Sequence, residues 1–375
     1  MRIERRAQPS RALQIGAPFV AIAFTLLITS ALVAWAGAPV GRAYALLLEG
    51  GFGSRFAWSE TLTRATPLIL TGLAAAVAFK ARLFNIGAEG QLYMGALAAV
   101  AVGAHVTDHT ALEAPPMLAF TLMMLAAAAA GAALLLVPAI FKSRLGVDEV
   151  VTTLLLNFIA LLFVSMMLDG PMKDPGGMGW PQTVTLPDAL QLSKLIERAR
   201  VHTGLLIALF LAVALWALLR FTSLGFEIRA VGANARAAQF AGMPVGWVNV
   251  KVALMSGALA GLAGAIEVAG RTGYVTLDMS PGYGYSGIVI AMLAALNPLG
   301  VVAAAVFVAG ILVGADSMSR AVNVPTYIAD VIVAVSLLSM LVASLLANYR
   351  IIFKRPSSAA TAAATEATTG SADAH

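Results

Sequence analysis

Polar residues that could take part in chemistry are few in this sequence, and the densest group lies in LFNIGAEGQLYMGALAA (residues 83–99). Asn85, Glu89 and Gln91 stand there among glycines, and a run of small apolar residues follows. Polar groups at membrane depth are costly unless they face a cavity or a partner, and interrupted helices at that depth expose helix ends to a transported solute. The alternative is a cytoplasmic turn in which Glu89 is a favourable charge at the start of the next helix. The three polar residues together favour a solute pathway.

A second patterned segment, GFEIRAVGANARAAQFAGMPV (residues 225–245), lies between two long apolar runs. Residues 233–241 form a helix-compatible run, with Gly232 and Gly242 at its ends and Pro244 preventing its continuation. A short surface helix of small residues can dock into a groove of another protein. The arginines of the segment would also suit a connector that lies on lipid headgroups. The pattern slightly favours partner binding.

Several kinds of chemistry are excluded or disfavoured. The sequence has no cysteine, so disulfides and thiolate metal sites are excluded, and its 4 histidines are too scattered to suggest a metal cluster. No G-x-x-x-x-G-K-[ST] loop occurs, so the chain should not bind ATP in the P-loop manner. The energy for transport must then come from another subunit or from an ion gradient. We expect a transport subunit without a cofactor of its own, rather than an enzyme.

The elements that carry these segments are expected to be membrane helices. The 375 residues are 60% hydrophobic and only 11% charged, with a mean hydropathy of +0.87. Soluble domains are closer to half apolar and about a quarter charged, so lipid must be the solvent for much of this chain. The net charge of +5 does not indicate nucleic acid, because the basic residues are spread singly through short loops, as membrane orientation requires.

Apolar runs long enough for one helical crossing, roughly 20 residues each, predict an all-α fold of about ten spans. Inner loops would hold more lysines and arginines than outer loops if both termini were cytoplasmic. The expected spans lie near residues 17–37, 62–80, 88–105, 116–140, 148–168, 203–220, 247–268, 284–297, 299–316 and 326–347. The expected regions are a cytoplasmic segment 1–16, a permease domain 17–347 with a periplasmic loop 169–202 and a cytoplasmic loop 221–246, and a disordered cytoplasmic tail 348–375.

Five segments, in this order, resemble the permeases of ABC importers for nucleosides and simple sugars, which are related to branched-chain amino-acid and ribose permeases. The resemblance runs from about residue 62 to residue 347. The segments are FNIGAEGQ (84–91), VDEVVTTLLLNFIA (147–160), EIRAVGANARAAQFAG (227–242), SGALAGLAGAIEVAG (256–270) and GYGYSGIVIAMLAALNPLG (282–300). One departure is Ala235, where members of the family often have proline after the asparagine.

The resemblance implies two related halves of a ten-helix permease in the bacterial inner membrane. It also implies partners: ATP-binding subunits, a solute-binding protein, and a second permease that is a similar chain or a second copy. The implied solute is a nucleoside or a related sugar-like compound. An ion-coupled carrier is the alternative, but it should keep a relay of charged residues at the membrane midplane. A third candidate, a channel, should show a ring-forming selectivity segment, and no such segment is evident.

The patterns and the resemblance together imply two sets of residues, because residues 227–242 resemble the cytoplasmic loop of the family that docks on the ATPase. The expected solute pathway comprises Asn85, Glu89, Gln91, Asn157, Tyr285 and Asn297. The expected coupling site for the ATPase comprises Arg229, Gly232, Ala233, Asn234, Ala238 and Gly242. The glycine-rich run from Ser256 to Gly264 is instead expected to allow close packing of helices.

Overall fold

The computed structural model falls into two units, residues 1–31 with 334–375 and residues 32–333, which are described separately. It describes residues 2–5, 11–107, 115–197, 199–322, 331, 334–335, 338–339, 342–343 and 349–352. The expected span at 326–347 therefore lies largely outside the described residues.

The first unit contains most of α1 (Arg11–Trp35) and a pair of antiparallel strands, β1 (Arg2–Arg5) and β2 (Tyr349–Ile352). Arg2 lies opposite Ile352 in the register. The strands were not predicted, and β2 falls within the tail that was expected to be disordered. The remainder of that tail, residues 353–375, lies outside the described residues.

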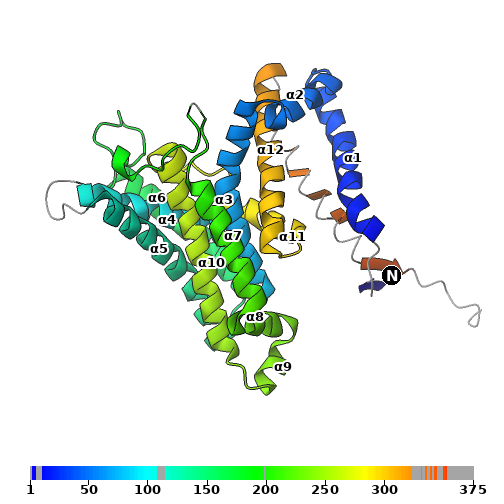
Figure 1. Cartoon of the computed structure of the whole chain (residues 1–375), viewed down its shortest axis with the longest axis vertical. Helices are drawn as coiled ribbons and strands as arrows, with labels where there is room; N and C mark the ends of the chain where they lie inside the picture. Colours follow the sequence, from blue (N-terminus) through cyan, green and yellow to red (C-terminus); the bar gives the residue numbers. More distant parts are fainter. Residues whose placement is uncertain are drawn as a thin grey trace, which may run out of the picture. The chain divides into compact units, whose positions relative to one another are not determined.

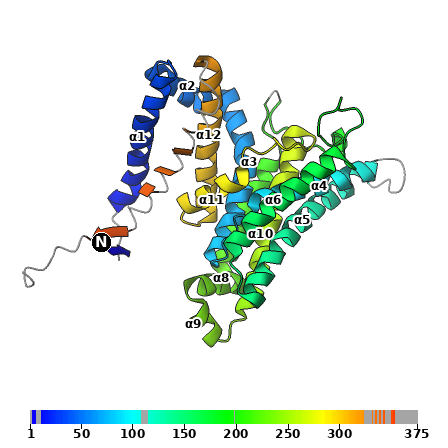
Figure 2. The ribbon, with the colours of Figure 1, turned by 180° about the vertical axis from the view of Figure 1, so that it is seen from behind.

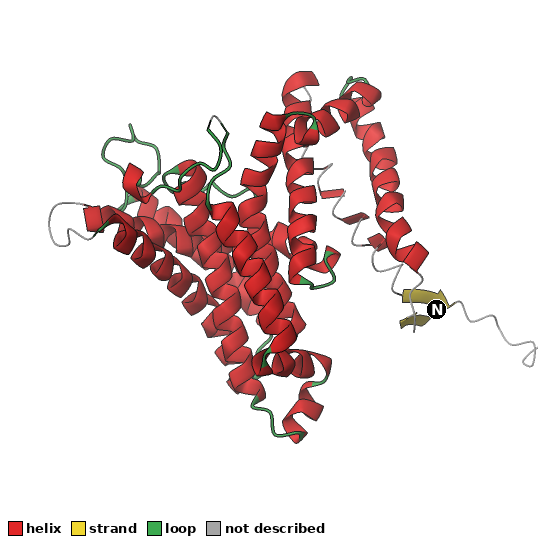
Figure 3. Cartoon of the chain, viewed as in Figure 1, coloured by secondary structure: helices red, strands yellow, loops and turns green. Residues whose placement is uncertain are grey.

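The second unit is helical throughout its regular elements (Figures 1 and 3). Its helices are α2 (Val40–Phe52), α3 (Arg55–Lys80), α4 (Ala88–Thr107), α5 (Pro116–Leu145), α6 (Glu149–Asp169), the 3₁₀ turn η1 (Asp188–Leu190), α7 (Gly204–Phe221), α8 (Ser223–Ala233), α9 (Ala235–Phe240), α10 (Val245–Glu267), the π-helical turn η2 (Val268–Thr272), α11 (Tyr283–Leu293) and α12 (Pro298–Val322).

Six helices in the described part of the chain are long and apolar enough to cross a membrane: α3, α5, α6, α7, α10 with η2, and α12. The bent pair formed by α1 and α2 would make up to 7. The prediction of a helical, multi-pass membrane protein is therefore confirmed. The count of ten spans and the cytoplasmic location of both termini stay predictions.

Helices α3 and α10 form the centre of the second unit, because most of their apolar length is buried, whereas α5, α6 and α7 are largely exposed. Figure 2 shows α4 and α5 beside α10, and both helices contact it. Small residues let these helices approach closely. Gly257 of α10 lies against Gly131 of α5, and Gly261 lies against Gly95 of α4. The packing role expected for the run from Ser256 to Gly264 is confirmed.

Three helices differ from the predictions. The helix α2 was not predicted at all, and α3 begins at Arg55 rather than near residue 62, with the Ser54 hydroxyl accepting from the Ala57 amide at 3.0 Å. The first turns of α3 carry the charges of Glu60 and Arg64, which lower the local hydropathy. Glu60 forms ion pairs with Arg64 and with Arg200, and these pairs stabilise the charges within the helix. The run predicted at 284–297 is also shorter, because α11 has only 11 residues. At about 1.5 Å per residue it is too short to cross a bilayer.

Candidate solute pathway and coupling segment

The N-terminal ends of α4 and α11 meet inside the bundle. The Gly284 amide of α11 donates to Glu89 Oε2 of α4 at 2.6 Å, and the Thr71 hydroxyl of α3 donates to the Tyr283 carbonyl at 2.9 Å. A side chain at position 284 would lie only 2.6 Å from the Glu89 Cα, so the close approach requires glycine. Thr71 is about 14 Å along α3 from Lys80, at about 1.5 Å per residue. The helix ends therefore meet well inside the span.

The Glu89 side chain lies between the N-terminal ends of α4 and α11. Each N-terminus carries a partial positive charge, so two N-termini that face each other repel unless an anion lies between them. Glu89 lies in the first turn of α4, is only 4% exposed, and accepts a hydrogen bond from the start of α11. Glu89 therefore lies at the start of its own helix, as in the alternative interpretation of the sequence, and also contacts the second helix. The region in which α4 and α11 meet is called the helix junction below.

Asn85 and Gln91 hold the backbone of the break between α3 and α4. Asn85 Nδ2 donates to Gln91 Oε1 at 2.9 Å and to Ser256 Oγ at 3.0 Å. Asn85 Oδ1 accepts from Gln91 Nε2 and from the Gly87 amide, both at 2.9 Å. Both amide side chains are buried, and Asn85 uses both of its donors and both sides of its acceptor. These two residues shape the helix junction rather than offering free hydrogen-bonding groups to a cavity.

Asn157 and Tyr285 extend the same cluster to α6 and α11. Asn157 Nδ2 donates to the Ile86 carbonyl at 2.8 Å and to the Tyr285 hydroxyl at 3.2 Å, and its Oδ1 accepts from the Gly90 amide at 2.8 Å. Asn157 is fully buried, whereas Tyr285 is 39% exposed. The structure therefore brings five of the six predicted pathway residues together, and Tyr285 is the one that reaches an accessible surface.

Asn297 is not part of this cluster. Its Oδ1 accepts from the Leu299 amide at 3.1 Å at the start of α12. The preceding residue, Leu296, accepts from Lys80 Nζ at 3.2 Å, which places this turn beside the C-terminal end of α3. Asn297 caps a helix there instead of joining the helix junction.

The predicted coupling run consists of two helices rather than one. Asn234 ends α8 and caps α9, where its Oδ1 accepts from the Ala237 amide at 3.1 Å. Ala233 therefore belongs to α8, and Gly242, at φ +81°, follows α9 in a left-handed conformation. Figure 1 shows α8 and α9 at one end of the bundle formed by α3, α7 and α10.

Contacts anchor this segment to the membrane helices. Gly232 lies against the Lys80 carbonyl at the end of α3, so any side chain there would collide with that backbone. Arg229 donates to the Leu219 carbonyl near the end of α7, a favourable position for a cation. Ala238 is buried at 4% exposure. These contacts connect α8 directly to the ends of α3 and α7.

Phe240, at the end of α9, was missed by the sequence analysis. It is 94% exposed, an unusual environment for so large an apolar side chain. The signal was present in the sequence as a single aromatic residue within a run of small residues. The name coupling segment is used below for α8 and α9 together.

A charged cluster near the opposite end of α3 was also missed. Arg64 Nη2 lies 2.6 Å from Asp316 Oδ2, and Arg64 Nε lies 3.8 Å from Glu60 Oε1. Arg271 Nη1 lies 2.5 Å from Glu267 Oε1. The four-residue spacing of 60 with 64 and of 267 with 271 was the available signal for ion pairs on helices.

Comparison with known proteins places these features in a family. Residues 57–342 match the family described as "Branched-chain amino acid transport system / permease component". The chain is similar to the guanosine ABC transporter permease protein NupP of Bacillus subtilis, with 36% identity over 86% of this chain and 91% of the relative. It is 38% identical to the glucose ABC transporter permease protein of Haloferax volcanii, over 94% of each chain. A second guanosine permease protein of Bacillus subtilis, NupQ, is 27% identical over 66% of this chain and 77% of the relative.

Proposed function

We propose a specific function on the premise that this chain belongs to the family of permease components of branched-chain amino acid transport systems. The chain is a membrane-spanning permease subunit of an ABC importer, a transport component rather than an enzyme. The solute that we propose is a nucleoside or a related sugar-like compound. The names of two relatives support this choice, because one is a guanosine permease and the other a glucose permease.

The helix junction is the observation that carries the proposed pathway. Interrupted helices whose N-termini meet inside a membrane protein are typical of solute sites in transporters. Tyr285 is the partly exposed member of the cluster and is proposed to face the solute. Asn85, Gln91 and Asn157 are proposed to position the junction, and Glu89 to hold α4 and α11 together. Asn297 is proposed to act at the inner end of the path.

The coupling segment is proposed to receive the energy of ATP from a separate ATPase subunit. The ATP would bind to that subunit, and this chain would need no cofactor. Its contact with the coupling segment would favour one conformation of the permease, and the difference in binding energy between conformations would set the populations. Arg229, Gly232 and Ala238 connect the segment to the membrane helices, so they are proposed to transmit this change.

The proposed assembly contains a second permease, two ATPase subunits and a solute-binding protein in the bacterial inner membrane. Bacillus subtilis has two guanosine permease proteins similar to this chain, which supports a pair of different permeases over two copies of one. The largely exposed apolar faces of α5, α6 and α7 suit lipid or such a partner. Both termini are proposed to lie in the cytoplasm.

The test is uptake of a radiolabelled nucleoside into proteoliposomes that contain this chain, its partner permease, the ATPase and the binding protein. A variant with Gly232→Leu and Ala238→Leu should lose at least about 90% of ATP-dependent uptake, because a side chain at Gly232 collides with the Lys80 carbonyl. The amount of assembled complex is measured beside uptake, and a loss of uptake at equal assembly supports the coupling role. Gly246→Leu is the matched control, since a side chain at Gly246 meets no other atom within 4 Å. Uptake by this chain alone, independent of ATP and of the double substitution, would instead show an ion-coupled carrier.

A further inference from the structure

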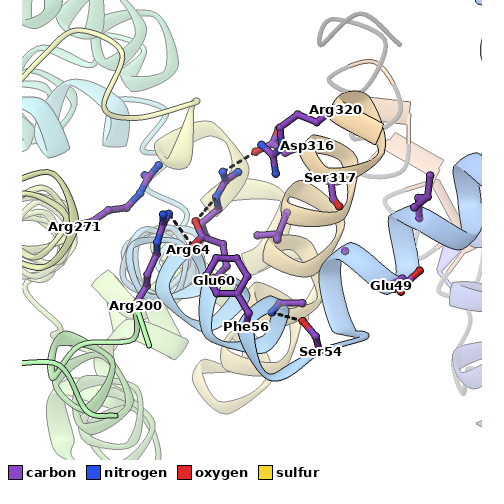
Figure 4. Close-up of a pocket in the computed structure, with 14 residues that line it drawn as sticks. Glu49, Ser54, Phe56, Glu60, Arg64, Arg200, Arg271, Asp316, Ser317 and Arg320 are labelled. Carbon is purple, nitrogen blue, oxygen red and sulfur yellow. Dashed lines mark hydrogen bonds and ion pairs between the residues drawn. The ribbon is translucent and has the colours of Figure 1, made fainter. Parts of the chain in front are cut away.

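A cavity of about 530 Å³ lies between α2, α3 and α12, and the residue Arg200 of the loop before α7 also lines it. Figure 4 shows its charged lining residues. The volume falls within the range of about 300–1,000 Å³ that is usual for small-molecule sites. It is therefore large enough for a solute of the size of a sugar or a nucleoside.

Three of the four arginines that line the cavity are paired with carboxylates, and the fourth, Arg320, is exposed. Arg64 pairs with Asp316 at 2.6 Å, and Arg200 Nη1 donates to Glu60 Oε2 at 3.2 Å. Arg271 pairs with Glu267, which lies fully buried behind the cavity wall. Because each of these guanidinium groups already has a carboxylate partner, an anionic solute would have to displace one. The cavity thus offers many hydrogen-bonding groups with little excess charge.

One buried polar atom of the cavity lining, the donor Arg64 Nε, lacks a hydrogen-bond partner among the residues that the structure describes. The acceptor Glu267 Oε2, which lies behind the wall, lacks one as well. A buried polar group without a partner costs about 1–3 kcal/mol, so such atoms indicate a missing partner. A hydroxyl group is both a donor and an acceptor. Neighbouring hydroxyl groups of one solute can therefore bind to paired arginines and carboxylates without changing the net charge of the site.

A series of hydrogen bonds connects the cavity lining to the helix junction. Arg271 Nη1 donates to the Tyr283 hydroxyl at 3.2 Å, and Tyr283 is the first residue of α11. The Tyr283 carbonyl accepts from Thr71, beside the contact of Gly284 with Glu89. A solute in the cavity that moves the Arg271 side chain can therefore also move Tyr283 and the start of α11.

One lining residue adds an apolar surface. Phe56 is the single aromatic residue that lines the cavity, and the Arg200 guanidinium lies 5.7 Å from the centre of its ring. A ring face beside hydrogen-bonding groups suits a solute that has both an apolar face and hydroxyl groups, as sugars and nucleosides do.

We propose that this cavity is a binding site for an uncharged, polyhydroxylated solute, a sugar or a nucleoside without phosphate groups, on its way to the helix junction. The inference rests on the proposed function and adds to it the location of a site and the discrimination against charged solutes. Glu60, Arg64 and Asp316 are its principal binding residues, and Arg271 links it to α11.

The absence of cysteine from the chain provides a direct test. Ser317→Cys places a thiol in the cavity wall of the assembled complex, and its rate of reaction with a maleimide is measured with and without guanosine, the binding protein being present in both samples. We expect guanosine to slow labelling at least about fivefold. Ser193→Cys, at an exposed serine of the loop before α7, is the matched control and should react at the same rate in both samples.

A second arm tests the charge discrimination. Guanosine 5′-monophosphate at the same concentration should leave the labelling rate of Ser317→Cys unchanged. Adding Glu60→Gln to Ser317→Cys should abolish protection by guanosine, whereas adding Glu197→Gln, which removes an exposed charge outside the cavity, should not.

The outcomes separate this inference from the proposed function. If the complex with the cysteine takes up guanosine but guanosine does not slow labelling, the cavity is not the binding site, although the importer function stands. Equal protection by the monophosphate would overturn the proposed selectivity. A third outcome is that the complex without substitutions does not take up guanosine, while glucose slows the labelling of Ser317→Cys. The proposed nucleoside would then be wrong, and the cavity would stand as a site for hydroxylated compounds.

Discussion

The helix junction and the charged cavity are both polar regions of a largely apolar protein, but they are built differently. At the junction, Asn85 and Gln91 are buried and bind to each other and to the backbone, so that Asn85 uses all of its hydrogen-bonding capacity. At the cavity, Arg64 Nε in the lining and Glu267 Oε2 behind it are buried atoms without hydrogen-bond partners among the described residues. Asp316, on the cavity wall, is also partly accessible.

This difference separates residues that maintain a shape from residues that bind. A fully satisfied polar cluster stabilises one backbone conformation, because any departure leaves buried groups unpaired. An incompletely satisfied cluster beside a cavity has capacity for a ligand. Substitutions at the junction should therefore reduce both stability and transport. Substitutions in the cavity should reduce transport with little loss of stability.

The largest loss of stability is expected for Asn85→Leu. The substitution leaves the Gln91 amide and the Gly87 amide without partners, and the expected loss in free energy of unfolding is about 3–5 kcal/mol. Thermal unfolding of the purified protein in detergent measures it. The double variant Asn85→Leu with Gln91→Leu should lose less than the sum of the two single variants, because the two amides are each other's partners. Additive losses would mean that the amide pair does not form.

The next effect depends on pH and comes from His202, just before α7. Both ring nitrogens are buried and lack a partner in the described part of the chain, and burial lowers the pKa of His202 to about 4 from its usual 6.5. The unfolded chain then binds a proton more readily than the folded chain between these two values. Stability should therefore be unaffected above pH 6.5 and should fall by up to about 3 kcal/mol as the pH decreases towards 4.

Unfolding measured at several pH values tests this expectation for His202. Comparison with His202→Leu isolates the contribution of the imidazole, because the carboxylates titrate in both proteins. The variant should lose less stability than the unsubstituted protein between pH 6.5 and pH 4. Parallel curves for the two proteins would show that His202 is solvated or paired.

A smaller loss is expected for Asp316→Asn in the cavity. The side chain of Asp316 is 35% exposed, and a partly exposed ion pair contributes about 0–1 kcal/mol. The melting temperature in detergent should change by only a few degrees, while ATP-dependent uptake should fall at least about tenfold. The opposite result, a large loss of stability with normal uptake, would make the cavity a structural cluster like the junction.

The sequence predicted the junction better than the cavity, and the reason is the distance along the chain between partners. Asn85, Glu89 and Gln91 lie within seven residues, and the glycines beside them signalled a break in a helix. The structure places these residues together at the break before α4, but their mutual hydrogen bonds were not foreseen. Arg64 pairs with Asp316, some 250 residues away, so no local pattern reveals that contact. The early start of α3 was missed for the same reason. Glu60 and Arg64 lower the local hydropathy there, and their partners Arg200 and Asp316 are distant in the sequence.

The smallest effect on stability is expected at the coupling segment, which differs from both polar regions in that it exposes a large apolar side chain. Phe240 is almost fully exposed, so Phe240→Ala removes little buried surface and should change the free energy of unfolding by less than about 0.5 kcal/mol. Large aromatic side chains at interfaces often contribute about 2 kcal/mol or more to binding. We therefore expect Phe240→Ala to weaken binding of the ATPase at least about tenfold and to reduce uptake accordingly.

Binding of the purified ATPase to the permease in detergent, measured by titration, tests this expectation for Phe240. Trp247→Ala is the matched control, because Trp247 is also an exposed aromatic residue but lies beyond α9, at the start of α10. A loss confined to Phe240→Ala would show that exposure marks a protein contact in α9 and not a general contact with lipid. Equal losses for both would assign the exposed aromatics to the headgroup region, and the coupling contact would then rest on the small residues of α8 and α9 alone.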